Sequence, residues 1–286
     1  MHTDGKTVDT TGAVCESLLI AAGPMDILVV GCGWAGSYIA AELLAAGHRV
    51  WATCRSPDKA QHLAQIGLIS LVVDFDREEP LPRFEQEAFD TAIISVPVTR
   101  KDDVDGVNQR FTKLQAFLAG ITFRQSFFFG SVGIYPKVSA VIAEDTFSDN
   151  ALDEKLLLGE SKLQAAYPNL NVLRLGGLFG LDRVIAKYFA GKVCDIGYQT
   201  ANFVHVVDIY GVIRVMIEKK SQGKTYNIVC PQHPLKKDVI EASAARYGYD
   251  VPLAYSETDK TAKIVSPGRL LTDLAYQFSY PSPLQF

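Results

Sequence analysis

Residues 27–36 of the chain read ILVVGCGWAG, an uninterrupted aliphatic run that ends in three closely spaced glycines. Four consecutive aliphatic residues, three of them β-branched, are typical of a strand that is buried on both faces of a parallel sheet. From Trp34 onward the apolar residues recur at helical spacing as far as Gly47, which can end a helix in a left-handed turn. The stretch therefore predicts a strand, a tight turn and a helix in immediate succession.

The same alternation continues through the first two thirds of the chain. Strands are expected over residues 48–53, 71–73, 92–96, 127–129 and 171–175, and helices over residues 107–118 and 156–166. Strands that alternate with helices form a parallel sheet covered on both faces. The predicted fold class is thus α/β, a Rossmann-type doubly wound parallel sheet over residues 25–180. Residues 181–286 are expected to form a smaller C-terminal lobe that binds substrate.

Residues 1–24 are expected to form a flexible N-terminal extension. Their short apolar stretch, residues 18–22, faintly resembles a secretory signal, but Glu16 interrupts its apolar run and Asp4 and Asp9 offset its single lysine.

Composition narrows the class of partner. The net charge of −4 and the absence of a Lys/Arg block speak against nucleic acid and against a polybasic membrane surface, so we expect a small-molecule partner. Five widely spaced cysteines without a C-x-x-C pair predict no metal site and no disulfide framework, which fits a reducing cytoplasm. No apolar run approaches the roughly 18 residues that span a bilayer.

The glycines form the pattern G-x-G-x-x-G between a strand and a helix, which is typical of a dinucleotide site. Gly31 makes the turn, Gly33 admits the diphosphate and Gly36 permits close packing of the helix, whose amino-terminal amides favour the anion. The alternative is a glycine-rich turn without function. The predicted cofactor contacts are Gly31, Gly33, Trp34, Gly36, Arg55, Ser56, Asp74, Ser95, Val96, Gly177 and Leu178.

The end of the second predicted strand indicates which dinucleotide binds. An acidic residue there accepts hydrogen bonds from the adenosine ribose, whereas this chain has Arg55 and Ser56, with Lys59 nearby. Because no carboxylate repels a 2′-phosphate and a guanidinium can bind one, NADP(H) is preferred over NAD(H). Asp74 either accepts from the adenine amino group or is an ordinary turn carboxylate.

Three stretches carry a resemblance to a known family. The glycine motif, residues 131–135 (SVGIY) and Lys162 resemble the short-chain dehydrogenase/reductase (SDR) superfamily in its extended, epimerase/dehydratase-like form. Residues 174–180 (RLGGLFG), 189–192 (FAGK), 202–205 (NFVH) and 226–228 (YNI) are similar to an atypical bacterial branch, the YeeZ-like proteins. The resemblance implies a dinucleotide-dependent oxidoreductase or epimerase. Relatives often dimerise through the two helices that here carry Leu114 and Leu163; the alternative is that the apolar faces of these helices simply pack in the core.

The resemblance also implies a catalytic tyrosine in Y-x-x-x-K, but Lys162 would place it at position 158, which is leucine. Leu158 cannot transfer a proton, so another group supplies the acid or the usual carbonyl reduction does not occur. The remaining catalytic candidates are Ser131, Lys162, Tyr135 and His205, each with a purely structural alternative. Substrate contacts are expected from Ser131, Arg183 and His205.

Two functions are therefore in competition. In the first, the protein is an NADP(H)-dependent oxidoreductase or epimerase/dehydratase acting on a small molecule. In the second, it is a non-catalytic dinucleotide sensor or scaffold that has lost the acid.

Overall fold

The computed structural model describes residues 23–77 and 80–286 of the chain, and its main layer is a seven-stranded, fully parallel sheet. In sheet order β11-β7-β5-β4-β1-β2-β3, the chain direction of the crossovers reverses between β4 and β1. The strands are β1 (Asp26–Val30), β2 (Arg49–Cys54), β3 (Ile69–Val72), β4 (Ala88–Ile94), β5 (Thr122–Ser131), β7 (Asn171–Leu175) and β11 (Thr225–Ile228). Such a reversal creates the crevice in which open α/β sheets bind ligands. The predicted doubly wound α/β sheet is confirmed.

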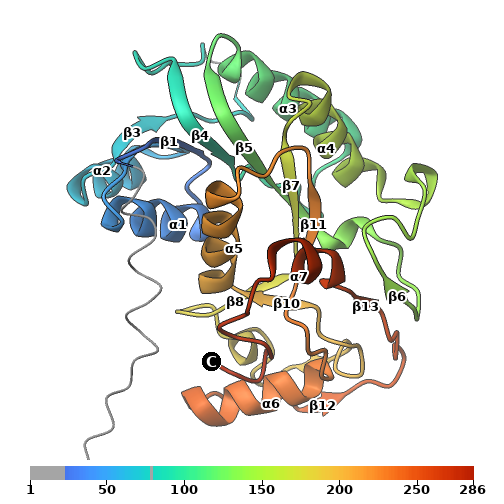
Figure 1. Ribbon diagram of the computed structural model, residues 1–286. Helices are drawn as coiled ribbons and strands as arrows, with labels where there is room; N and C mark the ends of the chain where they lie inside the picture. Colours follow the sequence, from blue (N-terminus) through green and yellow to red (C-terminus); the bar gives the residue numbers. More distant parts are fainter. Residues whose placement is uncertain (1–22, 78–79) are drawn as a thin grey trace, which may run out of the picture.

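Helices cover both faces of this sheet (Figure 1). One face carries α1 (Trp34–Ala45), α2 (Pro57–Gln65) and α5 (Val206–Glu218), and the other carries α3 (Val104–Leu118) and α4 (Glu154–Ala166). Successive residues of β1 alternate between the two faces, so Ile27 and Val29 join the first core cluster while Leu28 and Val30 join the second. All four side chains are fully buried, as expected for a strand with helices on both sides.

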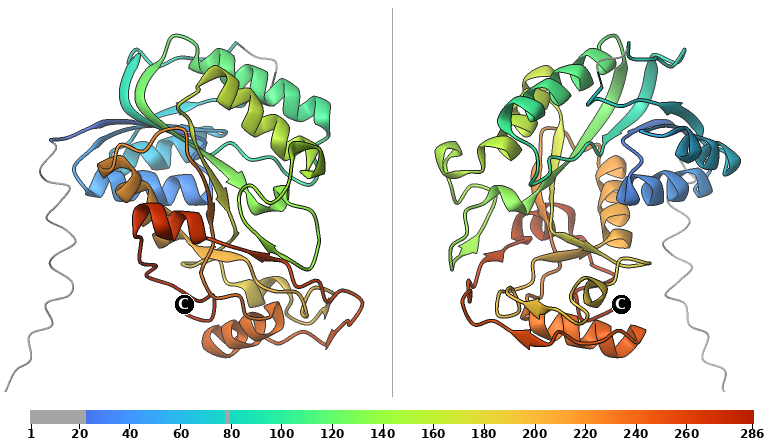
Figure 2. Two further views of the ribbon diagram at one scale, coloured as in Figure 1. Left: turned by 45° about the vertical axis from the view of Figure 1, so that its right-hand side comes forward. Right: turned by 180° about the vertical axis from the view of Figure 1, so that it is seen from behind.

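Leu114 of α3 and Leu163 of α4, the residues named for a possible dimer face, are buried in the second cluster of this same chain. These leucines are therefore core residues and are not available to a partner. The two helices pack directly against each other (Figure 2).

The remaining elements form a smaller part at one end of the molecule (Figure 2). It contains the parallel two-stranded pairs β8 (Gly177–Phe179) with β10 (Phe203–His205), β9 (Val193–Cys194) with β12 (Ala254–Tyr255), and β6 (Val141–Ile142) with β13 (Ile264–Val265), together with α6 (Lys236–Tyr247). Helix α7 (Gly268–Leu274) instead packs against β11, and its Leu270 and Leu274 join the first core cluster.

The chain after residue 180 does not stay within this smaller part. Strand β11 pairs with β7 at the edge of the main sheet, and α5 packs against α1, so residues 206–228 belong to the main layer. The boundary expected between residues 180 and 181 therefore does not divide the main sheet from the smaller part, because β11 lies beyond it and still belongs to the main sheet. The expected extension lies, as far as residue 22, outside the described residues. No helix among residues 23–77 and 80–286 is both long and apolar enough to cross a bilayer.

Candidate functional site

The turn after β1 has the geometry that a dinucleotide needs. Gly31 has a φ of 92°, and a Cβ there would lie 2.9 Å from the Ser95 carbonyl oxygen. A Cβ on Gly36 would lie 2.6 Å from the carbonyl oxygen of Gly31, so both positions exclude a side chain for internal reasons. Gly33 differs, because a Cβ there would meet nothing within 4 Å. Its side is left open for a ligand.

Helix α1 begins just behind this turn, and no side chain caps its first turn. Its first amides thus keep donor capacity, and the helix dipole adds positive potential at the same place. The turn itself is fixed from β2, since Thr53 Oγ1 accepts from the Gly31 amide at 2.9 Å and the Thr53 carbonyl accepts from the Cys32 amide at 2.7 Å.

A cleft of about 880 Å³ opens over this turn. Its walls come from the carboxyl ends of β1, β2, β3 and β4 and from the segment after β8. Among the predicted cofactor contacts, those that line it are Gly31, Gly33, Trp34, Arg55, Ser56, Asp74, Ser95, Val96 and Leu178. Gly36 lies behind the turn, and Gly177 lies outside the lining, with its amide bonded to the Asn202 carbonyl at 2.8 Å.

Cations gather at the end of the cleft next to β2. Arg55 is exposed at the end of β2, and Ser56 caps α2 by accepting from the Lys59 amide at 3.4 Å. The Lys59 ammonium lies close enough to act on the pKa of the buried thiols Cys32 and Cys54, although burial dominates and raises that of Cys32 to about 12. Arg55 and Lys59 therefore flank the position expected for the 2′-phosphate.

The outer wall of the cleft is an ion-pair network that the sequence did not suggest. Arg110 of α3 donates to Asp76 at 2.6 Å and to Asp102 at 2.8 and 3.0 Å, which ties the loop after β3 to the loop after β4. Asp74 accepts from the Asp76 amide at 3.0 Å and pairs with Arg77 at 3.4 Å. Asp74 thus stabilises its own turn and also lines the cleft.

Residues 180–183 form a tight turn that meets the glycine loop. Gly180 and Arg183 pair backbone to backbone, and Leu181 has a φ of 53°. The indole Nε1 of Trp34 donates to Asp182 at 2.7 Å, and the Arg183 guanidinium lies 4.7 Å from the centre of the Trp34 ring. We call Trp34, Asp182 and Arg183 the strap. Arg183, expected to bind substrate, here lines the large cleft.

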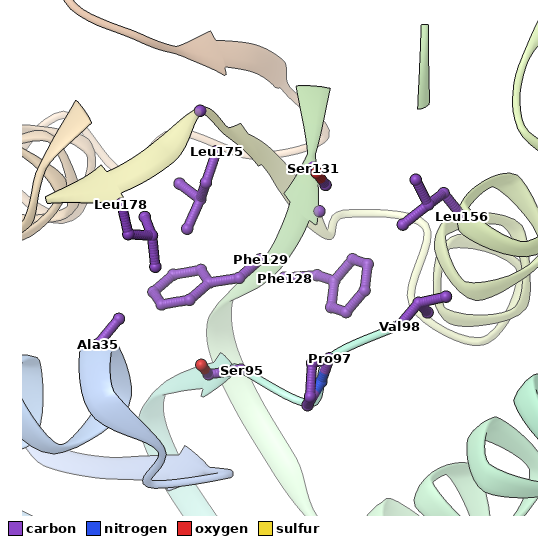
Figure 3. A pocket seen from close by; sticks show the side chains of 12 residues that line it. Ala35, Ser95, Pro97, Val98, Phe128, Phe129, Ser131, Leu156, Leu175 and Leu178 are labelled. Carbon is purple, nitrogen blue, oxygen red and sulfur yellow. The ribbon is translucent and has the colours of Figure 1, made fainter. Parts of the chain in front are cut away.

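A second, smaller cavity of about 210 Å³ continues from the cleft toward the ends of β5 and β7 (Figure 3). Phe128 and Phe129 project from opposite sides of β5 in that view, and most of the lining is apolar. We call this cavity the reaction pocket; it is lined by Ala35, Ser95, Pro97, Val98, Phe128, Phe129, Gly130, Ser131, Leu156, Leu175, Gly176 and Leu178. Ser131 is the catalytic candidate that lines it, and its Oγ accepts from the Gly133 amide at 3.0 Å.

The structure does not bring Lys162 to this pocket. Its ammonium donates to Asn108 at 2.6 Å and to Thr112 at 2.8 Å, both on α3. Leu158 packs in the cluster on the α3 side as well. The face of α4 that meets β5 instead carries Leu156, which lines the reaction pocket, and Glu160, one turn later.

Glu160 is locked in an ion pair. It is 2% exposed, and Arg174 of β7 donates to its carboxylate at 2.8, 3.1 and 3.2 Å. Burial raises the pKa of Glu160, while Arg174 opposes that rise. The spacing of four residues that the family uses for tyrosine and lysine is thus occupied on this face by Leu156 and Glu160.

Tyr135 and His205 are also engaged elsewhere. The Tyr135 hydroxyl donates to Asn227 at 2.6 Å and accepts from Arg174 at 2.9 Å, and burial raises its pKa. His205 caps α5 by accepting from the Val207 amide at 3.3 Å and stacks on Tyr280 at 3.7 Å; burial lowers its pKa to about 4. Neither residue lines the cleft or the reaction pocket.

Within the described ranges no group of three or more His, Cys, Asp or Glu side chains is arranged to hold a metal ion. Lys59, noted near Arg55 in the sequence, lines the cleft. The residues of the site that the sequence did not suggest are Asp182 in the strap and Leu156 in the pocket, because each depends on a contact with a distant element.

Comparisons with known proteins agree with this architecture. The family model of ketopantoate reductase PanE/ApbA matches residues 27–111. Protein YeeZ of Escherichia coli is 26% identical over 268 residues, which cover 90% of this chain and 97% of that protein. Human epimerase family protein SDR39U1, solved with NADPH, is 18% identical with a TM-score of 0.65 and covers 90% of this chain and 96% of its own.

The enzyme WbmG of Bordetella bronchiseptica, solved with NAD, is 15% identical with a TM-score of 0.71, covering 92% of this chain and 91% of its own. The chain therefore has the extended SDR, NAD-dependent epimerase-like fold, as its resemblance implied.

Proposed function

We propose that the protein binds NADP(H) in the large cleft and is an oxidoreductase or epimerase/dehydratase that acts on a small molecule in the reaction pocket. The observation that carries this proposal is the turn from Gly31 to Gly36, which excludes side chains behind the loop and leaves Gly33 open toward a cleft of about 880 Å³. A glycine that only shaped a turn would not need open space on its ligand side.

The preference for the phosphorylated cofactor rests on residues of this chain. One relative is solved with NADPH and another with NAD, so the fold does not decide the choice. Here β2 is followed by Arg55 and Ser56, and Lys59 lines the same end of the cleft. A guanidinium and an ammonium favour a phosphate dianion over a ribose hydroxyl.

In this proposal, residues of the cleft bind the cofactor and residues of the reaction pocket orient the substrate. When bound, the nicotinamide supplies or accepts the hydride. The α1 amides and Arg183 hold the diphosphate, and the apolar lining around Phe129 and Leu178 excludes water from the reaction pocket. Ser131 orients the substrate oxygen by a hydrogen bond at the carboxyl end of β5.

Thermal unfolding with NADPH, NADP⁺, NADH and NAD⁺ in parallel tests cofactor binding. A ligand at 100 times its dissociation constant adds about 2.7 kcal/mol of stability, which raises Tm by several degrees. We expect the phosphorylated pair to give the larger shift, and Arg55→Ala to remove that advantage. A chain that shifts with none of the four does not bind dinucleotide, and the proposal fails.

One observation favours a second function, that of a non-catalytic dinucleotide sensor. The α4 face toward Ser131 carries Leu156 and the ion-paired Glu160, and neither can donate a proton to a substrate there. Losing general acid catalysis typically costs about 10² to 10⁴ in rate.

Two matched variants separate the functions. Leu156→Tyr places a phenol beside Ser131, whereas Leu158→Tyr places one against α3 and serves as the control. For an enzyme we expect NADPH oxidation with a panel of carbonyl compounds to rise in Leu156→Tyr and to stay at the wild-type level in Leu158→Tyr. If wild type and both variants are inactive while NADPH still binds, the sensor is the correct assignment.

A further inference from the structure

One lysine of the smaller part, Lys263, contacts the turn that follows Ser131, and a second, Lys236, lies near Lys263. The Lys263 ammonium donates to the carbonyls of Val132 at 3.1 Å and Tyr135 at 2.9 Å. Val132 directly follows Ser131, so this ammonium is bonded to the backbone next to a residue that lines the reaction pocket. The Lys236 ammonium, at the start of α6, donates to the Gln199 side chain at 2.7 Å and is near enough to Lys263 for their charges to interact.

A second set of contacts fixes Lys263 against another wall of the pocket. The Asn202 side chain donates to the Lys263 carbonyl at 2.7 Å and accepts from the Val265 amide at 2.8 Å. The Asn202 carbonyl would lie 2.5 Å from a Cβ on Gly176, which lines the pocket. Lys263 is therefore bonded to two segments that adjoin residues of the pocket lining, the turn after β5 and the segment before β10.

The charges of this pair are poorly compensated. Both ammonium groups are half-buried, and the partners given above are neutral oxygens. Burial, with Lys236 adding to it, lowers the pKa of Lys263 to about 8. Burial also lowers the pKa of Lys236, and Arg100 and Lys137 act in the same direction.

The carboxylate that acts on Lys236 is Asp259, and it already has several other partners. It is ion-paired with Lys137 and accepts from Gln199 at 2.5 Å and from the Thr261 hydroxyl at 2.7 Å. Asp259 is thus shared between Lys137 and Lys236, while Arg100 adds a further positive charge near Lys236, and Lys236 is the charge that acts on Lys263. A half-buried cation without a counter-charge is unfavourable, and an anion from solution relieves it.

We propose that Lys263 and Lys236 bind an anionic group of the substrate, a carboxylate or a phosphate, at the rim of the reaction pocket. The pocket itself is mostly apolar, so the reacting carbon lies inside beside Ser131 and the anion stays outside. The substrate class is then a small anionic carbonyl compound or the corresponding alcohol. This inference rests on the proposed function, because it uses the pocket in which hydride transfer is proposed.

The other cation considered for this role is Arg183. It lies 4.7 Å from the centre of the Trp34 ring and lines the cofactor cleft, whereas Lys263 donates to the backbone carbonyl of Val132, directly after the pocket residue Ser131. The lysine pair is therefore better placed than Arg183 to select the substrate.

Calorimetric titration of the full chain with inorganic phosphate and, separately, with malonate tests the proposal and distinguishes the two anions. We expect one of the two to bind wild type, and its affinity to fall at least tenfold in Lys263→Met and in Lys236→Met. Lys260→Met is the matched control, because Lys260 is exposed in the same segment and paired with Glu257 at 2.8 Å. Lys263→Arg keeps the charge and should retain binding.

NADPH-dependent thermal shifts on the same proteins keep this inference separate from the proposed function. A wild type that shifts with NADPH but binds neither anion overturns the lysine site alone, and so does equal anion binding by wild type and both methionine variants. A wild type that binds an anion but shows no NADPH shift removes the proposed function instead. If Lys263→Met does not fold, Lys236→Met and Lys263→Arg still decide.

Discussion

The cofactor cleft and the reaction pocket adjoin each other, and they are built in different ways. The cleft rests on a short contiguous stretch, residues 31–36, in which Gly31 and Gly36 leave no room for a side chain and Gly33 faces open space. The end of the cleft next to β2 is charged. The reaction pocket is assembled from β5, α4, β7, β8, the start of α1 and the loop after β4, and it is mostly apolar. Under the proposed function, cofactor binding follows from a local motif, whereas the reaction depends on how distant segments meet.

Helix α4 shows this dependence clearly. Counting four residues back from Lys162 selects Leu158, but the helix turns both residues toward α3. The positions turned toward β5 are Leu156 and Glu160. Sequence spacing fixes which residues share a helix face, and only packing fixes which face meets the pocket.

Two glycine variants test the cleft and have the largest expected effect. Gly36→Ala places a Cβ 2.6 Å from the Gly31 carbonyl oxygen, so the loop must move. We expect a loss of about 4 kcal/mol in unfolding free energy and a fall of more than 100-fold in NADPH affinity. Gly33→Ala meets nothing within 4 Å and should keep wild-type stability while it weakens NADPH binding.

Denaturant unfolding and fluorescence titration measure the two quantities. Equal NADPH affinity in Gly33→Ala and wild type would mean that the diphosphate does not approach Gly33, and the contrast between cleft and pocket would lose its basis.

Glu160→Gln tests whether Glu160, on the face of α4 that meets β5, serves only as the ion-pair partner of Arg174. Removing one partner of a buried pair leaves Arg174 uncompensated, which costs about 3–5 kcal/mol. The double variant Glu160→Met, Arg174→Met removes both charges and should recover most of that loss in chemical unfolding. A Glu160→Gln protein with wild-type stability would show that Glu160 does not serve Arg174 and is available for chemistry.

The sequence was sufficient for six of the seven strands of the main sheet because each of them contains a short run of apolar residues. The seventh, β11, lies beyond the boundary expected at residue 180. Two-residue strands such as β9, β12 and β13 carry no such pattern, since they exist only where two loops meet. The same reason explains why the roles of Glu160 and Lys263 were not foreseen. Each role depends on a partner from a distant element, Arg174 or the turn after Ser131, and nothing in the local sequence encodes it.

His205, a catalytic candidate that lies outside the pocket lining, provides a pH test of its structural role. Burial lowers its pKa from 6.5 in the unfolded chain to about 4, so the folded protein disfavours its protonated form. The associated stability is present above pH 6.5 and is lost as the pH falls toward 4, by up to about 3 kcal/mol. His205→Asn keeps an α5 cap and should show a smaller loss between pH 7.5 and 4.5 in denaturant unfolding.

If His205→Asn has the same pH dependence of stability as wild type but a lower turnover at pH 7.5, His205 acts in catalysis and not as the structural cap described above.

A substitution in the strap has the smallest expected effect on cofactor affinity, but it separates the role of the cleft from that of the reaction pocket most clearly. The Arg183 guanidinium lies over Trp34 and lines the cleft, so it should contact the diphosphate, which NADPH and NADH share. We expect Arg183→Ala to weaken both cofactors about tenfold, or about 1.4 kcal/mol. Arg55→Ala, the matched control at the 2′-phosphate end, should weaken NADPH alone.

Trp34 itself reports the binding, because the other tryptophan, Trp51, is buried in β2 and Trp34→Phe identifies its background signal. Fluorescence titration of wild type, Arg183→Ala and Arg55→Ala with each cofactor gives the four comparisons. Unchanged cofactor affinities in Arg183→Ala, together with a raised KM for substrate, would move Arg183 from the cleft to the substrate. The strap would then join the two cavities functionally, and the division between a locally encoded cofactor site and an assembled reaction pocket would no longer hold.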